Sequence, residues 1–122
     1  FDSLPAGGTL EASVINATGT FTDSYLGVFD SSGNMIFAND DGAVGLFSEV
    51  VAGDNVLIPG DGILYFAVTS YQGTLGQETN PASYLNENNN TSSGTFDLVV
   101  IPAPSSLALL GLGGLVATRR RR

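Results

Sequence analysis

Apolar patterning between residues 1 and 101 is never sustained for longer than a strand needs, and this restricts the chain to β structure. Runs rich in Val, Ile, Phe, Tyr and Thr alternate with clusters of Gly, Asn, Asp, Ser and Pro. Branched and aromatic side chains suit a pleated surface, whereas the clusters supply turns. No stretch before residue 105 repeats its apolar residues with a helical period. The pattern predicts an all-β domain over residues 1–101, a β-sandwich of the jelly-roll kind.

Individual strands can be assigned from these runs. In the first run Leu10, Ala12 and Val14 share one face, which predicts that this face is buried. Ser31-Ser32-Gly33 predicts a hairpin between the second and third runs. Ile63–Tyr71 is the strongest run and is expected to be central in a sheet. The predicted strands are Thr9–Asn16, Tyr25–Asp30, Asn34–Ala38, Phe47–Val51, Asn55–Ile58, Ile63–Tyr71 and Thr95–Ile101.

Charge is divided between the body and the last four residues. All twelve acidic residues lie before residue 119, and the four basic residues are Arg119, Arg120, Arg121 and Arg122. A body of this charge repels nucleic acid, so we expect no nucleic-acid partner. The chain also lacks Cys, His and Lys. Because most catalytic sites depend on such residues, we expect a non-catalytic protein.

The chain changes character after residue 101. Pro102-Ala103-Pro104 ends the last strand, because proline has no backbone N–H to donate. The twelve residues Leu107–Thr118 are nearly all apolar, whereas a full membrane span needs about 20 residues. We therefore predict a short hydrophobic helix, with the terminal arginines on the cytoplasmic side and the acidic body outside. Its apolar positions are Leu107, Leu109, Leu110, Leu112, Leu115 and Val116.

The prolines, the Leu/Gly/Ala stretch and the arginine cluster together resemble the PEP-CTERM sorting signal of Gram-negative and related bacteria. The resemblance covers Ile101–Arg122 and assigns Pro102, Ala103 and Pro104 to the sorting motif, although the family usually has Glu where Ala103 stands. It implies a protein held at the inner membrane, processed by a membrane-embedded exosortase, and then placed at the cell surface or in the extracellular matrix. Since the first residue is Phe1, we expect an N-terminal region with a signal peptide to precede it.

The body carries a second resemblance. The segments Tyr25–Asn34, Ala38–Gly42 and Leu64–Val68 are similar to the bacterial pre-peptidase C-terminal domain. That resemblance implies a non-catalytic β-sandwich, and some of its members bind calcium or insoluble polymers.

An acidic turn within this region offers candidate calcium ligands. Asn39, Asp40 and Asp41 supply the oxygen atoms that calcium prefers, with Asp30 and Glu49 as further candidates from neighbouring strands. The same residues are typical of an ordinary Asx turn, and we favour that interpretation over a calcium site. Asp40 with Asp41, or either of them with Glu49, also makes a conceivable glycosidase pair, but we disfavour an enzyme.

Two functions remain open for the body. The leading prediction is a non-catalytic surface or matrix protein whose place is set by its tail. The alternative is a calcium-dependent carbohydrate- or polymer-binding module, with extracellular polysaccharide as a partner. Tyrosines would then stack on sugar rings; Tyr71 and Tyr84, which bracket the polar segment 72–94, are better candidates than Tyr65, which alternates with Phe66 in a core strand.

Overall fold

A computed structural model describes residues 1–42, 45–71 and 93–104, and these form two packed sheets. The predicted helix at Leu107–Val116, the terminal arginines, Tyr84 and most of the polar segment 72–94 lie outside the described residues. The strands are β1 (Leu10–Ile15), β2 (Ser24–Phe29), β3 (Met35–Asn39), β4 (Glu49–Val50), β5 (Tyr65–Ser70) and β6 (Asp97–Pro102), with a short 3₁₀ helix, η1, at Ala52–Asp54.

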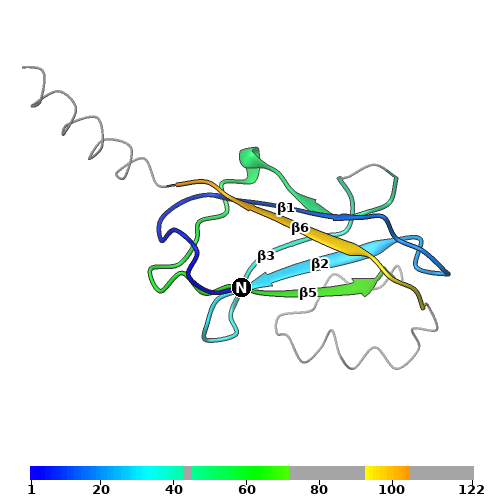
Figure 1. Cartoon of the computed structure of the whole chain (residues 1–122), viewed down its shortest axis with the longest axis horizontal. Helices are drawn as coiled ribbons and strands as arrows, with labels where there is room; N and C mark the ends of the chain where they lie inside the picture. Colours follow the sequence, from blue (N-terminus) through cyan, green and yellow to red (C-terminus); the bar gives the residue numbers. More distant parts are fainter. Residues whose placement is uncertain (43–44, 72–92, 105–122) are drawn as a thin grey trace, which may run out of the picture.

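The two sheets have three strands each and are antiparallel. One has the order β4-β1-β6 and the other β3-β2-β5. The first strand therefore pairs with the last, and the second with the second last, which is the nested pairing of a jelly roll. In Figure 1, β1 and β6 form the upper layer and β2 and β5 the lower one. The predicted all-β sandwich is confirmed.

The core lies between the sheets and uses the face predicted for β1. Leu10, Ala12 and Val14 are buried there because successive residues of a strand point to opposite faces. Strand β2 is the most deeply buried of the described strands, since every residue in it except Tyr25 is buried. The principal cluster consists of Leu10, Ala12, Leu26, Val28, Val50, Val56, Ile58 and Leu64.

Two of the strand predictions were wrong. The run Ile63–Tyr71 forms β5, but β5 is an edge strand and β2 is the central one. An apolar run indicates burial, whereas the place of a strand in a sheet depends on pairing with distant segments. The run Asn55–Ile58 forms no strand; it makes an isolated bridge between Leu57 and Thr9.

A buried pair of serines connects the two layers. Ser24 lies in β2, and Ser48 immediately precedes β4 of the other sheet. Their hydroxyl oxygens are 2.9 Å apart, and the backbone N–H of Ser48 donates to Ser24 Oγ at 2.7 Å. The Ser48 hydroxyl also reaches the carbonyl oxygens of Ser24, at 2.7 Å, and Asp40, at 3.0 Å. These bonds attach the turn after β3 to the interior.

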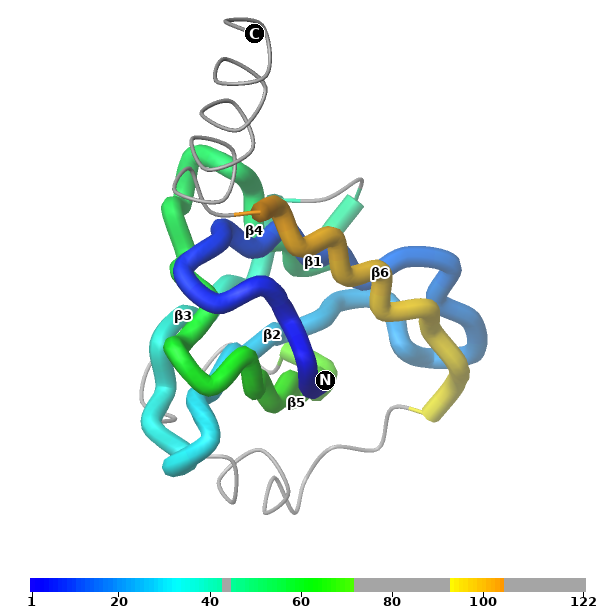
Figure 2. Tube along the Cα trace, turned by 60° about the vertical axis from the view of Figure 1, so that its left-hand side comes forward, coloured from blue at the N-terminus to red at the C-terminus, as the bar shows by residue number. Residues whose placement is uncertain are grey.

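The N-terminal segment crosses from one layer to the other before β1 begins (Figure 2). The N–H of Leu4 donates to Gly62 O at 3.0 Å, and the N–H of Gly7 donates to Ile58 O at 2.9 Å. The segment is thus held along residues 58–64. This route brings Gly8 and Thr9 beside the end of β6.

Candidate functional site

The predicted sorting motif starts inside the sheet. Strand β6 runs antiparallel to β1, with Val100 opposite Ala12 and Pro102 opposite Leu10. The strand ends at Pro102, as expected of a residue without a backbone N–H. One residue further on, the N–H of Ala103 donates to the carbonyl oxygen of Thr9 at 2.8 Å. The first two residues of Pro102-Ala103-Pro104 are therefore bound to the body.

The backbone at Gly8 lies unusually close to Ala103. A Cβ atom placed on Gly8 would overlap the carbonyl oxygen of Ala103 and would lie 3.1 Å from its carbonyl carbon. Gly8 is itself buried, and its carbonyl accepts the N–H of Ile58 at 2.8 Å. The segment Gly8–Leu10 is thus bonded to residues 56–58 on one side and to the start of the sorting motif on the other. We call Gly8 and Thr9 the junction clamp.

The outward face of β6 is only partly covered. Val99 and Ile101 are exposed on this face, with Ile101 56% exposed, while Val100 is half-buried toward the core. Ile101 lies opposite Glu11 of β1. The strand that leads into the sorting motif therefore presents apolar side chains next to an acidic residue.

The acidic turn after β3 forms as an ordinary Asx turn. Asn39 Nδ2 donates to Glu49 O at 2.9 Å, and Asn39 Oδ1 accepts the N–H of Asp41 at 3.3 Å. Both polar atoms of the Asn39 side chain are therefore engaged within the protein. The structure does bring Glu49 to this turn, since Asn39 bonds its carbonyl oxygen.

Asp23, which was not among the predicted ligands, also lies beside this turn. Burial raises the pKa of Asp23, and the negative charges of Asp41 and Asp40 raise it further. Its Oδ1 is inaccessible to water and has no hydrogen-bond partner among the described residues. The register of the predicted hairpin could have indicated this position of Asp23. Leu26 pairs with Asn39, so a residue just before β2 lies beside the residues just after β3.

Asp30 is not part of this turn. It lies at the opposite end of β3, where its carboxylate accepts the N–H groups of Ser32 and Asn34, both at 2.9 Å. The Asn34 side chain also donates to it at 2.9 Å. These bonds, the Asn34 side chain first, lower the pKa of Asp30. Asp30 therefore stabilises the predicted hairpin and is not a neighbour of the acidic turn.

Neither a metal cluster nor a membrane span occurs in the described part of the chain. Residues 1–42, 45–71 and 93–104 contain no group of three or more Asp, Glu, His or Cys side chains arranged to hold a metal ion. Within the same ranges, no helix has the length and apolar character needed to cross a membrane. Calcium at Asn39, Asp40 and Asp41 stays a prediction.

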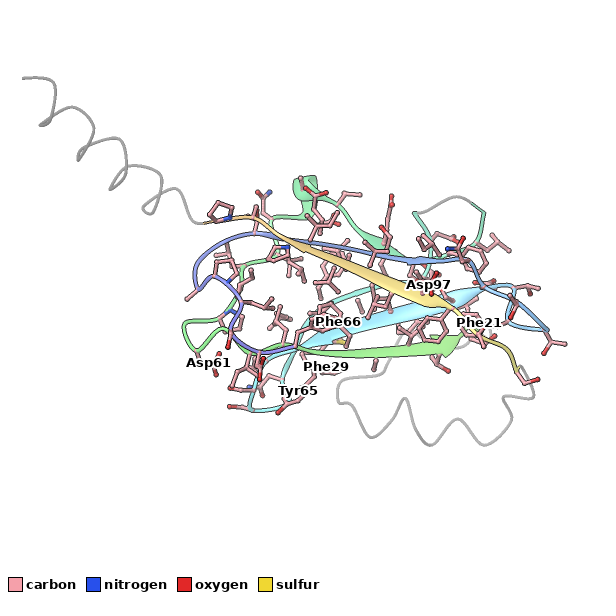
Figure 3. All side chains as sticks on the ribbon, in the orientation of Figure 1. Phe21, Phe29, Asp61, Tyr65, Phe66 and Asp97 are labelled. Carbon is pink, nitrogen blue, oxygen red and sulfur yellow. The ribbon has the colours of Figure 1, made fainter. Side chains whose placement is uncertain are left out.

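The aromatic residues of β5 point in opposite directions. Phe66 packs against the core and makes an edge-to-face contact with Phe1, the ring centroids being 5.2 Å apart. Tyr65 is 53% exposed. Figure 3 shows Phe66 between the layers and Tyr65 at the outer side of β5. Tyr65 lines an open hollow of about 400 Å³ together with Phe1, Asp2 and Ile63.

Comparison with known proteins identifies the C-terminal segment. A family model described as the PEP-CTERM protein-sorting motif matches residues 100–122. No curated protein and no solved structure matches the chain. The resemblance of the body to the pre-peptidase C-terminal domain stays a prediction, whereas the resemblance of the tail is confirmed. Residues 100–122 are a PEP-CTERM protein-sorting motif, so this is an exosortase-targeted protein, exported and anchored at the membrane before it is processed.

Proposed function

We propose that this is a non-catalytic protein of the bacterial surface or extracellular matrix, delivered there through its tail. The observation that carries the proposal is the direct continuation of β6 into the sorting motif. Because β6 spans the length of β1, the first residues of the sorting motif form part of a complete strand of the body. Whatever the tail determines about location therefore applies to the whole sandwich.

The composition supports a non-catalytic body. The chain has no His, Cys or Lys to act as a base, nucleophile or proton carrier near neutral pH. Its carboxylates serve structural purposes where their bonds are known: Asp30 organises a hairpin, and Asp54 caps the 3₁₀ helix η1 through the N–H of Val51 at 2.8 Å. An acidic surface also keeps an exported domain soluble.

The test is expression of the full chain behind a host export signal, with and without an exosortase. We expect the exosortase-containing cells to yield a shortened protein lacking Arg122 in the surface or extracellular fraction, measured by intact mass. A variant with Gln at positions 119–122 serves as the matched control and should remain full-length, because the basic end is lost. Recovery of the wild type only at full length, in the membrane fraction, would contradict the proposal.

A second candidate function is polymer binding, which the exposed Tyr65 favours. An aromatic ring in an open hollow beside Asp2 offers an apolar face and a hydrogen-bonding carboxylate, a combination that suits a sugar ring. Binding of the protein to a panel of insoluble polysaccharides, with calcium and with chelator, would test this function.

In that experiment Tyr65→Ala should abolish retention on the polymer. Tyr25→Phe changes a tyrosine that does not line the hollow and keeps its aromatic ring, so this variant should be retained like the wild type. Equal retention of wild type and Tyr65→Ala would remove the hollow from consideration. Loss of retention with chelator would connect binding to calcium.

A further inference from the structure

The first residues of the sorting motif belong to the folded body as much as to the tail. The family match begins at Val100, which lies within β6 and packs partly against the core. The pairing continues through Pro102, and Ala103 is bonded to Thr9. A processing enzyme thus meets Val100–Ala103 as a paired strand.

A peptide bond in a paired strand is a poor substrate. To be cut, a segment must leave its partner strand and extend in the active site of the enzyme, so cleavage requires local opening. At Ala103 opening would break the hydrogen bond to Thr9. The clamp itself is held in place from the other side, where Leu10 N–H donates to Val56 O at 2.9 Å and Ile58 N–H donates to Gly8 O at 2.8 Å.

Gly8 makes this arrangement sterically feasible. Because Gly8 has no Cβ, the carbonyl oxygen of Ala103 lies where a side chain would otherwise begin. Any other residue at position 8 would push Ala103 and Pro102 away from β1. The φ angle of Gly8 is not positive, so the requirement for glycine at this position is one of space.

We propose that Gly8 and Thr9 hold Val100–Ala103 within the folded sandwich, so that the junction clamp protects these bonds and the processed body retains them. The proposal rests on the processing of the tail proposed above. Hydrolysis adds water across one peptide bond and leaves a carboxylate on the body and an amine on the released peptide. With the clamp closed, that carboxylate lies at Ala103 or beyond. Gly8 is a positioning residue, since it acts through the backbone of Ala103.

The test uses the full chain in detergent and a protease of broad specificity, without any exosortase. The masses of the body fragments report where the chain is cut. In the wild type we expect the body to end at Ala103 or later. In Gly8→Ala we expect cleavage within Val100–Ala103 to be about tenfold faster, because the displaced segment opens more often.

Gly60→Ala is the matched control, since a Cβ at Gly60 would meet no atom within 4 Å. It should leave the cleavage pattern of the wild type unchanged. Amide hydrogen exchange at Ala103 gives an independent measurement, and it should be about tenfold faster in Gly8→Ala than in the wild type and in the control.

A second variant covers the case in which Gly8→Ala does not fold. Ala103→Pro replaces the N–H that Thr9 accepts with a ring carbon and leaves position 8 unchanged, and its melting temperature shows whether the body is intact. It should also accelerate cleavage within Val100–Ala103. Equal rates in the wild type and in the folded variants would overturn the proposal, as would rapid cleavage of the wild type inside Val100–Ala103. Because no exosortase is present, either result is independent of whether an exosortase recognises the tail.

Discussion

The negative charge of Asp23 conflicts with its surroundings. Its pKa is raised by burial and by the charges of Asp41 and Asp40, and one of its oxygens has no partner in the described part of the chain. A carboxyl group whose pKa is higher in the folded state than in the unfolded state binds its proton more tightly when folded. Ionised Asp23 therefore lowers the free energy of unfolding at neutral pH.

Asp23→Asn should stabilise the protein at pH 7. The expected gain is below about 1 kcal/mol, because the charges that surround Asp23 are partly screened by solvent. The gain is present above the raised pKa, decreases as the pH falls through it, and is absent below the ordinary pKa of an aspartate. Urea unfolding at a series of pH values measures it. A gain that persisted unchanged at low pH would contradict the electrostatic cause.

Ser48→Ala should destabilise the protein by about 1–3 kcal/mol. The substitution removes the hydroxyl that bonds the carbonyl oxygens of Ser24 and Asp40 and leaves buried polar groups without a partner. Chemical unfolding of both proteins gives the difference. Ser32→Ala is the matched control, since Ser32 is exposed in a turn, and its unfolding should match that of the wild type.

The hypothesis of a calcium site at the acidic turn leads to a separate prediction. Millimolar calcium should raise the melting temperature of the wild type, and Asp40→Ala should remove the increase because a ligand carboxylate is lost. Glu11→Ala removes an exposed carboxylate of β1 and should keep the increase. If calcium leaves the melting temperature of the wild type unchanged, the calcium site does not exist.

Among the elements, the β2–β3 hairpin shows how a short turn determines a strand pair. Asp30 accepts hydrogen bonds from Ser32 and Asn34, and Gly33 has a φ of 81°, a conformation that glycine adopts without strain. The backbone N–H of Asp30 closes the turn by donating to Asn34 O at 2.9 Å. The turn thereby places β3 beside β2, and with it the acidic turn beside Asp23.

Asp30→Ala should lower the melting temperature at pH 7. The hydrogen bonds from Asn34 lower the pKa of Asp30, so its contribution to stability is full above the ordinary pKa of an aspartate. The contribution is lost as the pH falls through the lowered pKa. Thermal unfolding from pH 7 to pH 2 should therefore show the two proteins converging. A constant difference across this range would assign the loss to the side chain's packing.

At the scale of the whole molecule, β6 closes the first sheet at a distance of more than eighty residues from β1 in the chain. Its pairing covers Asp97–Pro102 and continues to Ala103. Phe96 stacks on Phe21, with ring centroids 5.3 Å apart, at the end where β6 starts. The placement of the sorting motif is therefore coupled to the stability of the sandwich.

Truncated chains should show which C-terminal residues contribute to the stability of the sandwich. A chain that ends at Pro104 should keep the unfolding free energy of the full chain. A chain that ends at Val99 should lose about 2 kcal/mol or more, because it lacks the partly buried Val100 and the pairing beyond it. Urea unfolding of the two truncated chains in parallel decides the result. If they are equally stable, the last residues of β6 contribute nothing to the fold.

Local signals in the sequence were sufficient for several features. The alternation of Leu10, Ala12 and Val14 identified the buried face of β1, and Ser31-Ser32-Gly33 identified the hairpin. Both depend on the period of a strand and on turn chemistry, which act within a few residues. The sorting motif could likewise be predicted from the sequence, because its prolines, apolar run and arginines are contiguous in the chain.

The features that the sequence left undetermined all depend on distant segments meeting. The approach of Asp23 to Asp40 and Asp41 could have been inferred from the register of the predicted hairpin. The edge position of β5, in contrast, follows from no local pattern. The role of Gly8 also follows from no local pattern, because Gly8 lies in a turn-like stretch and only the fold brings it against Ala103. By itself, the sequence determined most of the strands and the presence of a sorting motif at the C-terminal end. Only the tertiary structure decided that the sorting motif begins inside the sheet, because backbone pairing between β1 and β6 connects residues that are 82 to 92 positions apart in the chain.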